Sequence, residues 1–301
     1  MAYDLIIIGA GPAGITAAVY AARKKMNFIV ITGDIGGQAA WSGDVENYTG
    51  YQFITGPDLA AKFEEHMRAY GISVKEREET RGIVKDGAVI RVRTEKGEYE
   101  ARSVIIASGK ASRELGVPGE KEFKNKGLTY CATCDGPLFS GKDVAVIGGG
   151  NSALDACLQL IKIASKVYII NNTAKLGGDH VMREKAEASP IVSVLNGTAV
   201  LAITGDDMVK GIRVKRPDKE ELIPVKGVFV EIGLIPNSKF AGIVDKNKLG
   251  EIKVNSNNET SIAGIFAAGD VTDVPEKQIV IACGEGSKAA LAAFKYISRN
   301  R

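Results

Sequence analysis

Two cysteines separated by two residues are the side chains whose type and spacing most directly indicate chemistry. Cys131 and Cys134 lie in the segment Tyr-Cys-Ala-Thr-Cys-Asp-Gly, and Asp135 follows them directly. This spacing suits a reversible disulfide, because the two sulfurs can close a small ring without large backbone movement. One thiol must become a thiolate to attack. We expect Asp135 either to exchange a proton with the departing thiolate or to serve as a helix cap or turn residue.

A metal site is the main alternative for the cysteine pair. Structural zinc needs four ligands, usually from two C-x-x-C units or from added histidines. The other cysteines, Cys157 and Cys283, are isolated in apolar helical stretches, and the two histidines are His66 and His180. We expect these four residues to pack in the core or to lie at the surface. The sequence therefore predicts a dithiol–disulfide switch and no metal site.

The elements that must position this pair follow a pattern that occurs twice. In the first occurrence, an apolar run over residues 4–8 leads into Gly9, Gly11 and Gly14. An alanine-rich stretch follows, and a second apolar run ends at Thr32. A strand, a glycine turn, a helix and another strand make a βαβ unit.

The second occurrence begins with an apolar run over residues 143–147 and has alanine in place of the third glycine, which the fingerprint permits. Its candidate nucleotide-binding residues are Gly148, Gly150, Asn151, Ser152 and Ala153. One such glycine pattern is a weak indication, but two of them, each between a predicted strand and a predicted helix, are a strong one. The glycines let the backbone approach a pyrophosphate, and the helix N-terminus supplies N–H groups and positive potential.

The spacing of these units indicates two domains, one inserted in the other. Glycine and proline interrupt the chain around residues 109–119 and again around residues 232–237, where we expect it to cross between domains. We therefore predict an α/β fold with two Rossmann-like dinucleotide-binding domains. Residues 1–113 and 238–301 form the discontinuous first domain and residues 114–237 form the inserted one. A strand ending at Gly269-Asp270 and a final helix over about residues 282–297 complete the first domain.

Composition narrows the range of partners and compartments. The 301 residues are 45% hydrophobic and 25% charged, with a net charge of +3, which gives no case for nucleic acid or an anionic membrane as the main partner. No positively charged leader precedes the first apolar run, and no apolar run approaches the ~18 residues of a spanning helix. We expect a cytoplasmic protein.

With these motifs on the page, the sequence resembles the low-molecular-weight thioredoxin reductases, together with the flavoprotein subunit of alkyl hydroperoxide reductase. The resemblance covers essentially the whole chain, and its landmarks are residues 9–14, 36–38, 46–48, 131–136, 148–153 and 264–270. Residues 227–237 and 277–281 are most similar to the hydroperoxide-reductase flavoprotein. The extra N-terminal thioredoxin-like part of that protein is absent, so we expect a free-standing reductase.

The resemblance implies FAD bound at the first fingerprint and a thioredoxin-like protein as partner. Its implied FAD-binding residues are Gly9, Gly11, Pro12, Ala13, Gly14, Thr32, Gly36, Gly37, Gln38, Asn47, Gly109, Gly269, Asp270, Lys277, Gln278 and Ile279. Thr32-Gly33 replaces the usual acid at the end of the second strand, as in related reductases. The family pattern further implies that Cys134 faces the flavin, that Cys131 attacks the partner's disulfide and that Asp135 is the acid/base. It also implies a homodimer and an inserted domain that rotates about the two crossings.

The electron donor is where the sequence departs from the family. NADPH-specific members carry His-Arg-Arg-x-x-x-Arg after the strand of the second unit, whereas residues 171–177 here read Asn-Asn-Thr-Ala-Lys-Leu-Gly. Lys175 is offset from both arginine positions, and a phosphate binds poorly without a guanidinium fork. The acid that NADH-using relatives place on the ribose is missing too, and Asn171 could hydrogen-bond a ribose only more weakly.

Three interpretations of this departure stay open. The chain accepts NADH or either nucleotide loosely; or it takes electrons from another donor, such as ferredoxin; or it keeps the second fingerprint only for helix–strand packing. The function predicted in each case is an FAD-dependent reductase of a thioredoxin-type disulfide. A flavin-bound redox sensor without steady turnover is a further hypothesis. A ferredoxin–nicotinamide oxidoreductase is less consistent with the sequence, because those enzymes lack the C-x-x-C.

Overall fold

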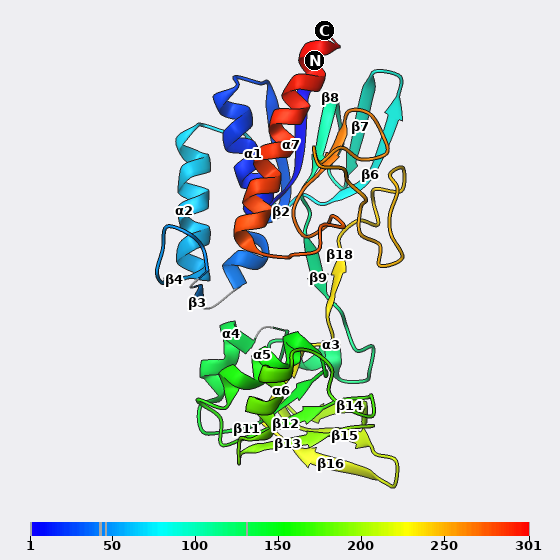
Figure 1. The fold of residues 1–301 in the computed structure, drawn as a ribbon. Coiled ribbons are helices and arrows are strands. Elements are labelled where there is room, and N and C mark those ends of the chain that lie inside the picture. Colours follow the sequence, from blue (N-terminus) through cyan, green and yellow to red (C-terminus); the bar gives the residue numbers. More distant parts are fainter. Residues whose placement is uncertain (1, 42–43, 46, 131, 301) are drawn as a thin grey trace. The chain divides into compact units, whose positions relative to one another are not determined.

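The chain forms two compact units. The computed structural model describes residues 2–41, 44–45, 47–130 and 132–300. Unit 1 comprises Met1–Ala111 and Ile235–Arg301, and unit 2 comprises Ser112–Leu234 (Figure 1). The chain passes from unit 1 to unit 2 through β9 (Lys110–Ser112) and returns through β18 (Leu234–Pro236), and these two strands pair with each other. The crossings predicted from the sequence are at residues 113/114 and 237/238.

Unit 1 is built on a seven-stranded sheet in the order β5-β2-β1-β8-β7-β6, with β19 paired to β8. Its strands are β1 (Tyr3–Ala10), β2 (Phe28–Ile35), β5 (Val74–Lys75), β6 (Thr80–Asp86), β7 (Val89–Thr94), β8 (Glu98–Ile106) and β19 (Ile265–Ala267). β1 runs parallel to β2 and β8, whereas β6, β7 and β8 form an antiparallel meander. The short strands β3 (Asp44–Val45) and β4 (Ile54–Thr55) form a separate pair.

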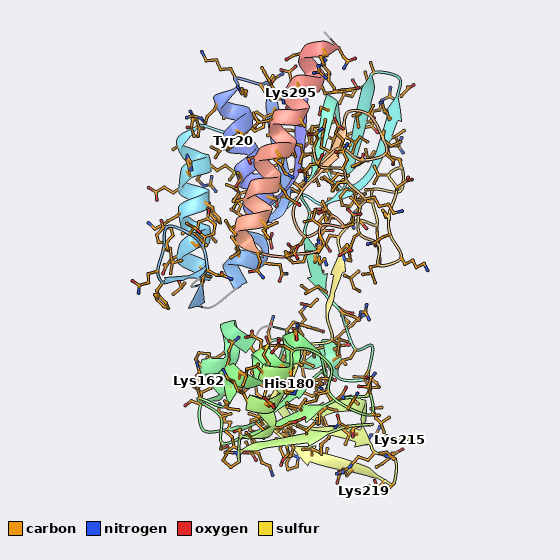
Figure 2. The ribbon with its side chains drawn as sticks, viewed as in Figure 1. Tyr20, Lys162, His180, Lys215, Lys219 and Lys295 are labelled. Carbon is orange, nitrogen blue, oxygen red and sulfur yellow. The ribbon has the colours of Figure 1, made fainter. Side chains whose placement is uncertain are left out.

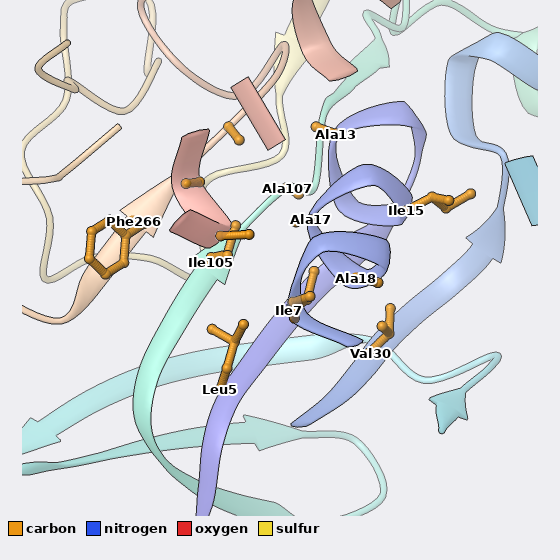
Figure 3. Packing of buried hydrophobic residues seen from close by; sticks show 14 of the residues in the cluster. Leu5, Ile7, Ala13, Ile15, Ala17, Ala18, Val30, Ile105, Ala107 and Phe266 are labelled. Atoms are coloured by element: carbon orange, nitrogen blue, oxygen red, sulfur yellow. The ribbon is translucent and has the colours of Figure 1, made fainter. Parts of the chain in front are cut away.

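Helices cover one face of this sheet. They are α1 (Pro12–Arg23), α2 (Gly56–Ala69) and α7 (Ile279–Arg299), and the 3₁₀ turn η1 (Gly37–Trp41) packs against α2. α1 and α7 run side by side (Figure 1). Small residues line their contact, and the clustered side chains of Leu5, Ile7, Ala17 and Phe266 fill the space beneath them (Figure 3). Pro12 suits the first helical position, because its missing N–H would be unpaired there in any case.

The central strand β1 is buried on both faces. Successive side chains of a strand point to opposite faces, so Leu5 and Ile7 join the helix-covered core while Ile6 and Ile8 join a second core. That second core also contains Val104, from the neighbouring strand β8. Residues 241–271 supply much of its covering layer. Burial on both faces explains the continuous apolar run at the start of the sequence.

Unit 2 has a parallel five-stranded sheet in the order β10-β17-β11-β12-β13. Its strands are β10 (Leu128–Thr129), β11 (Asp143–Ile147), β12 (Lys166–Ile170), β13 (Val192–Leu195) and β17 (Gly227–Val230). A three-stranded antiparallel sheet contains β14 (Ala199–Gly205), β15 (Val209–Lys215) and β16 (Glu220–Pro224). The helical segments are α3 (Glu120–Phe123), α4 (Ala132–Asp135), η2 (Gly136–Phe139), α5 (Asn151–Leu160) and α6 (His180–Glu187).

The predicted α/β fold with two Rossmann-like units is confirmed. Both predicted βαβ units form, with α1 and α5 following the two glycine turns. The final helix begins at Ile279 and ends at Arg299, so it is longer than the expected 282–297 at both ends. Among the helices of the described residues, none combines the length and the hydropathy that crossing a bilayer requires.

Two glycines of α7 provide a matched test of the α1–α7 contact. A Cβ at Gly286 would collide with the backbone carbonyl of Ala13, whereas a Cβ at Gly284 meets open space. We expect Gly286→Ala to destabilise the protein by about 1–3 kcal/mol through overpacking. Gly284→Ala should be neutral or stabilising by up to about 1 kcal/mol, because alanine favours a helix. Chemical unfolding of the two variants measures this difference, and equal stability would show that the helices can separate without cost.

Candidate functional site

The first glycine turn is fixed by close backbone contacts. Gly9 has φ +103°, and a Cβ there would collide with the carbonyl of Ala107, which directly follows β8. A Cβ at Gly14 would collide with the carbonyl of Gly9 itself. At Gly11, by contrast, the nearest atom to an added Cβ is Gly37 Cα at 4.0 Å. Gly9 and Gly14 thus serve the fold, while Gly11 leaves space for a ligand to approach the backbone.

The N-terminus of α1 fits an anionic group. Gly11 is its N-cap, no described side chain caps the helix, and its first turn contains no acid. Unpaired N–H groups and the helix dipole at such an end attract phosphate. Gly37 and Gly269 also lie here, since a Cβ on Gly37 would touch Gly11 and one on Gly269 would touch Ala13. The structure therefore brings together glycines from three of the sequence motifs at a place that suits the pyrophosphate of a dinucleotide.

Thr32, within β2, holds this turn by hydrogen bonds. Its buried hydroxyl accepts a hydrogen bond from Ala10 N–H at 3.2 Å and donates one to the carbonyl of Asp34. The hydroxyl is therefore already engaged with the backbone of the glycine turn at Ala10 and with that of its own strand at Asp34. Thr32 holds the fingerprint in shape, a role that differs from that of the acid usually found at this position.

The remaining candidate FAD residues form two connected groups in unit 1. Asn47 Nδ2 donates to Gln278 Oε1 at 3.0 Å, just before Ile279 begins α7. Gln38 Nε2 lies 3.4 Å from the carbonyl of Lys110, the residue that follows Gly109. Side-chain amides thus tie the loop after Gly36 and the start of α7 to their neighbours.

An acidic and basic cluster surrounds Asp270. Burial raises the pKa of Asp270, while the charges of Lys277 and Lys110 act to lower it. Both lysines pair with Glu251, at 3.3 Å and 2.9 Å. Burial acts to raise the Glu251 pKa, but the hydrogen bonds from Lys110 and Asn247 and the charge of Lys277 outweigh it and lower that pKa. Sequence reasoning missed Lys110 and Glu251, because neither stands in a recognisable motif.

The redox segment follows β10 in unit 2. Cys131 lies outside the described residues, and Cys134 is described only as part of the short helix α4. Asp135 ends that helix, and its carboxylate accepts a hydrogen bond from Thr129 Oγ1 at the end of β10. The predicted acid/base is thus held by the strand that leads into the cysteine segment.

A buried carboxylate anchors the residue before Cys131. Glu120 is 2% exposed and accepts hydrogen bonds from Leu115 N–H and Gly116 N–H, both at 2.7 Å. It also accepts one from the hydroxyl of Tyr130 at 2.8 Å. Burial and the hydrogen bond to Glu120 raise the pKa of Tyr130 well above its ordinary value. Sequence reasoning missed Glu120, because neither this residue nor its three hydrogen-bond partners belongs to a recognisable sequence motif.

The second glycine turn repeats the contacts of the first. Gly148 has φ +140°, and a Cβ there would collide with the carbonyl of Glu231, while Gly150 faces open space. Ala153 is buried, so the third fingerprint position serves helix–strand packing. Asn151 Oδ1 accepts from Asp179 N–H at 2.7 Å, and Ser152 Oγ donates to the carboxylate of Glu231. Two of the five candidate residues are therefore engaged with other parts of unit 2.

Asn171 has a different role from the ribose contact considered above. It is 2% exposed, and its Oδ1 accepts from the N–H and the hydroxyl of Thr173 at 3.2 and 2.9 Å. Its Nδ2 donates to Asn196 Oδ1 at 2.8 Å and to Thr173 O at 3.2 Å. An amide offers two donor hydrogens and two acceptor lone pairs. Both donor hydrogens are used, and the oxygen accepts from Thr173 N–H and shares the single hydroxyl proton of Thr173 with the carbonyl of Lys175. Asn171 thus closes the loop after β12 and is engaged within it.

The remaining cysteines and the histidines lie in the core or at the surface. Cys157 is buried in α5, and Cys283 is partly buried in α7, where its sulfur accepts a hydrogen bond from the Tyr48 hydroxyl at 3.8 Å. His66 is exposed, and His180 lies at the surface at the start of α6 (Figure 2), with Nδ1 3.5 Å from Glu184. Among the residues that the structure describes, no three His, Cys, Asp or Glu side chains gather as a metal site would require.

The fold and these two glycine turns define the class of protein. The chain belongs to the pyridine nucleotide-disulphide oxidoreductase family, whose pattern it matches over residues 3–286. It is therefore an oxidoreductase, and the family implies a flavin cofactor. Its structure is similar to the thioredoxin reductases of Lactococcus lactis (TM-score 0.86, 34% identity, 99% of both chains) and T. acidophilum (TM-score 0.84, 38% identity, 97% and 98%). The expected resemblance to the low-molecular-weight thioredoxin reductases is confirmed.

Other relatives carry different names. A ferredoxin-flavin thioredoxin reductase from Clostridium acetobutylicum is similar in structure (TM-score 0.55, 31% identity, 99% of this chain and 98% of that one). Among curated proteins, an NADH dehydrogenase of Ferdinandcohnia aciditolerans is 43% identical over 302 residues. An alkyl hydroperoxide reductase subunit of Pseudomonas aeruginosa is 43% identical over 306 residues. Each of these two matches covers 99% of this chain, which spans only 58% and 59% of their length.

Glu120 generates a prediction about stability. Glu120→Ala removes the acceptor for two backbone N–H groups and one hydroxyl, and we expect it to lower the free energy of unfolding by about 3 kcal/mol. Tyr130→Phe removes one of these hydrogen bonds and should cost about 1 kcal/mol. Glu122→Ala, an exposed neighbour on α3, is the control and should stay within about 0.5 kcal/mol of the parent. Denaturant unfolding provides the values, and a Glu120 variant as stable as the Glu122 control would contradict the anchoring role.

Proposed function

We propose that this chain is an FAD-dependent reductase of thioredoxin-type disulfides, with Cys131 and Cys134 as its redox pair. The observation that carries the proposal is the placement of the cysteine segment directly after β10. The segment lies at the carboxyl edge of a parallel sheet and includes Asp135, which Thr129 holds in place. Ligands and reacting groups of open α/β sheets concentrate at this edge. The similarity to thioredoxin reductases supports the same conclusion.

The first glycine turn is where FAD would bind. The uncapped N-terminus of α1, with Gly11, Gly37 and Gly269 around it, would hold the pyrophosphate. Asp270 and the Lys277–Gln278–Ile279 segment follow Gly269 in the chain and would contact other parts of the cofactor. FAD bound there would supply a two-electron carrier between the donor and the Cys131–Cys134 disulfide.

The chain's own residues complete the transfer to the partner. The Cys131 thiolate attacks one sulfur of the partner's disulfide, and the other partner sulfur leaves and takes up a proton. The Cys134 thiol, after losing its proton, then attacks Cys131, which releases the second partner thiol and forms the Cys131–Cys134 disulfide. We propose Asp135, whose carboxylate is bonded to Thr129, as the group that exchanges these protons. Leu138, three residues further on, is 67% exposed and offers an apolar contact for a protein partner next to the motif.

For the half-reaction in which the flavin would be reduced, we propose an electron donor other than NADPH. The arginines that would bind a 2′-phosphate are missing, and Asn171 is engaged within its own loop. The similarity to a ferredoxin-flavin thioredoxin reductase supports a ferredoxin-type donor. The second candidate is NADH, which the relative named NADH dehydrogenase supports.

The cysteine pair is tested by Cys134→Ser. The purified parent should be yellow, and the variant should keep its flavin but lose disulfide reduction by on the order of a thousandfold, because the disulfide can no longer form. Cys157→Ala is the control: burial raises the pKa of the Cys157 thiol to about 12, and its replacement should leave the reductase activity intact. Absorbance at the flavin band and reduction of a thioredoxin-type protein are the measurements. A folded but colourless parent would refute the flavin, and a parent that is reduced without turnover would favour the redox sensor.

The donor is tested by anaerobic reduction of the flavin. Parallel titrations with NADPH, NADH and reduced ferredoxin should show that ferredoxin or NADH bleaches the flavin faster than NADPH does. Without an arginine fork, NADPH should require concentrations far above the ~1 μM at which tight nucleotide sites are half-saturated. Rapid and complete reduction by micromolar NADPH would contradict this part of the proposal.

A further inference from the structure

Glu231 stands between the cysteine segment and the second glycine turn. β17 lies between β10 and β11 in the sheet, and all three strands are parallel. The residues that follow these strands therefore meet at one edge. Cysteines follow β10, the glycine turn follows β11, and Glu231 follows β17 directly.

The contacts of Glu231 tie it to both neighbours. Its N–H donates to Ile147 O at 2.7 Å, at the end of β11. Its carboxylate accepts a hydrogen bond from Ser152 Oγ, on the first turn of α5. It also accepts one from Ala132 N–H, the backbone group that follows Cys131 and begins α4. One carboxyl group thus links the first peptide of the cysteine helix to the fingerprint helix.

We propose that Glu231 is a positioning residue that makes the ionisation of the Cys131–Cys134 thiols depend on the protonation of its own carboxyl group. This proposal rests on the proposed function, because it takes the two cysteines to be the redox pair. The hydrogen bond to Ala132 N–H orients the start of α4, and a negative charge on Glu231 opposes a thiolate on the same segment. A like charge nearby disfavours ionisation and raises a thiol's pKa.

The surroundings of Glu231 place its titration in the neutral range. Burial raises the pKa of Glu231 to about 7, and the nearby charge of Asp155 acts in the same direction. The hydrogen bonds from Ser152 and from Ala132 N–H act to lower it. Glu231 is therefore largely neutral below about pH 6 and largely ionised above about pH 8.

Few other charges face this carboxyl group. On α5 the charged residue is the exposed Asp155, and on α4 it is Asp135, which is bonded to Thr129. β10 and β17 carry no charged residue, and Asp143 of β11 begins that strand at the far edge of the sheet. Within the described residues, Glu231 is thus the acid that links the two elements directly.

The test compares the flavin-loaded parent with Glu231→Gln, both in a Cys134→Ser background that leaves Cys131 as the thiol of the motif. Glutamine keeps acceptor and shape but carries no charge. Alkylation by iodoacetamide is followed across pH on the peptide that contains Cys131, which separates it from Cys157 and Cys283. We expect equal rates below about pH 6 and alkylation about threefold or more faster in the Gln variant near pH 8, where the parent's carboxylate raises the thiol pKa. A rate ratio that stays at one across this range would overturn the proposal.

Two further variants shift the transition in opposite directions. Ser152→Ala removes a hydrogen bond that favours the carboxylate, so the pH at which the parent's profile changes should rise. Asp155→Asn removes a repelling charge, so that pH should fall. If the two variants shift the pH of this transition in the same direction, or do not shift it, Glu231 is not the titrating group.

A separate measurement distinguishes this inference from the function on which it rests. Reduction of a thioredoxin-type disulfide by the dithionite-reduced parent, with both cysteines present, tests the redox pair without reference to Glu231. Absence of that reduction would refute the proposed function. Normal reduction together with indistinguishable alkylation profiles would refute the role of Glu231 alone.

Discussion

The close approach of a glycine turn to the end of the neighbouring parallel strand is the constraint on which both units depend. Gly9 lies against the carbonyl of Ala107, and Gly148 lies against that of Glu231. Gly9 lies near the end of β1 and Gly148 directly follows β11, and in each unit the carbonyl belongs to the residue that follows the strand beside it. No side chain fits between them, so the turn, the helix that follows and the adjacent strand end take up their places together.

The two units use this shared arrangement differently. In unit 1 the N-terminus of α1 has no described side-chain cap, and glycines leave the backbone accessible. In unit 2 the equivalent region is occupied by polar side chains of the unit itself, with Ser152 on Glu231 and Asn171 folded into its own loop. The same backbone geometry is thus open to a ligand in one unit and partly engaged within the protein in the other. The residue whose carbonyl contacts the glycine is Ala107 in unit 1 and Glu231 in unit 2. The glutamate adds a carboxyl group at this strand end, beside the redox segment of unit 2.

The sequence was most informative where structure is specified locally. Glycines between an apolar run and an alanine-rich stretch predict a strand, a turn and a helix without knowledge of distant residues, and both units formed as expected. The C-x-x-C spacing likewise identifies the candidate redox pair by itself. The start of α7 at Ile279 was predicted too late, because the first three residues of the helix, Ile279, Val280 and Ile281, are β-branched and have low helix propensity.

The acids that organise the site could not be predicted in this way. Glu120, Glu231 and Glu251 follow no pattern in the sequence, and their partners lie in other elements: Tyr130, Ser152 and Lys110. For Asn171, the sequence suggested a role that the geometry does not support. Its position after a Rossmann strand favours a ribose contact, and only the geometry of Thr173 and Asn196 shows that its amide is already engaged.

The protonation of the isolated thiols has a consequence for how the protein would meet reactive small molecules. Burial raises the pKa of Cys157 to about 12, and burial also raises that of Cys283. At neutral pH both sulfurs stay as thiols, which are poor nucleophiles. An electrophilic inhibitor or a cellular oxidant that requires a thiolate would therefore react slowly with Cys157 and Cys283, whatever the ionisation of the C-x-x-C.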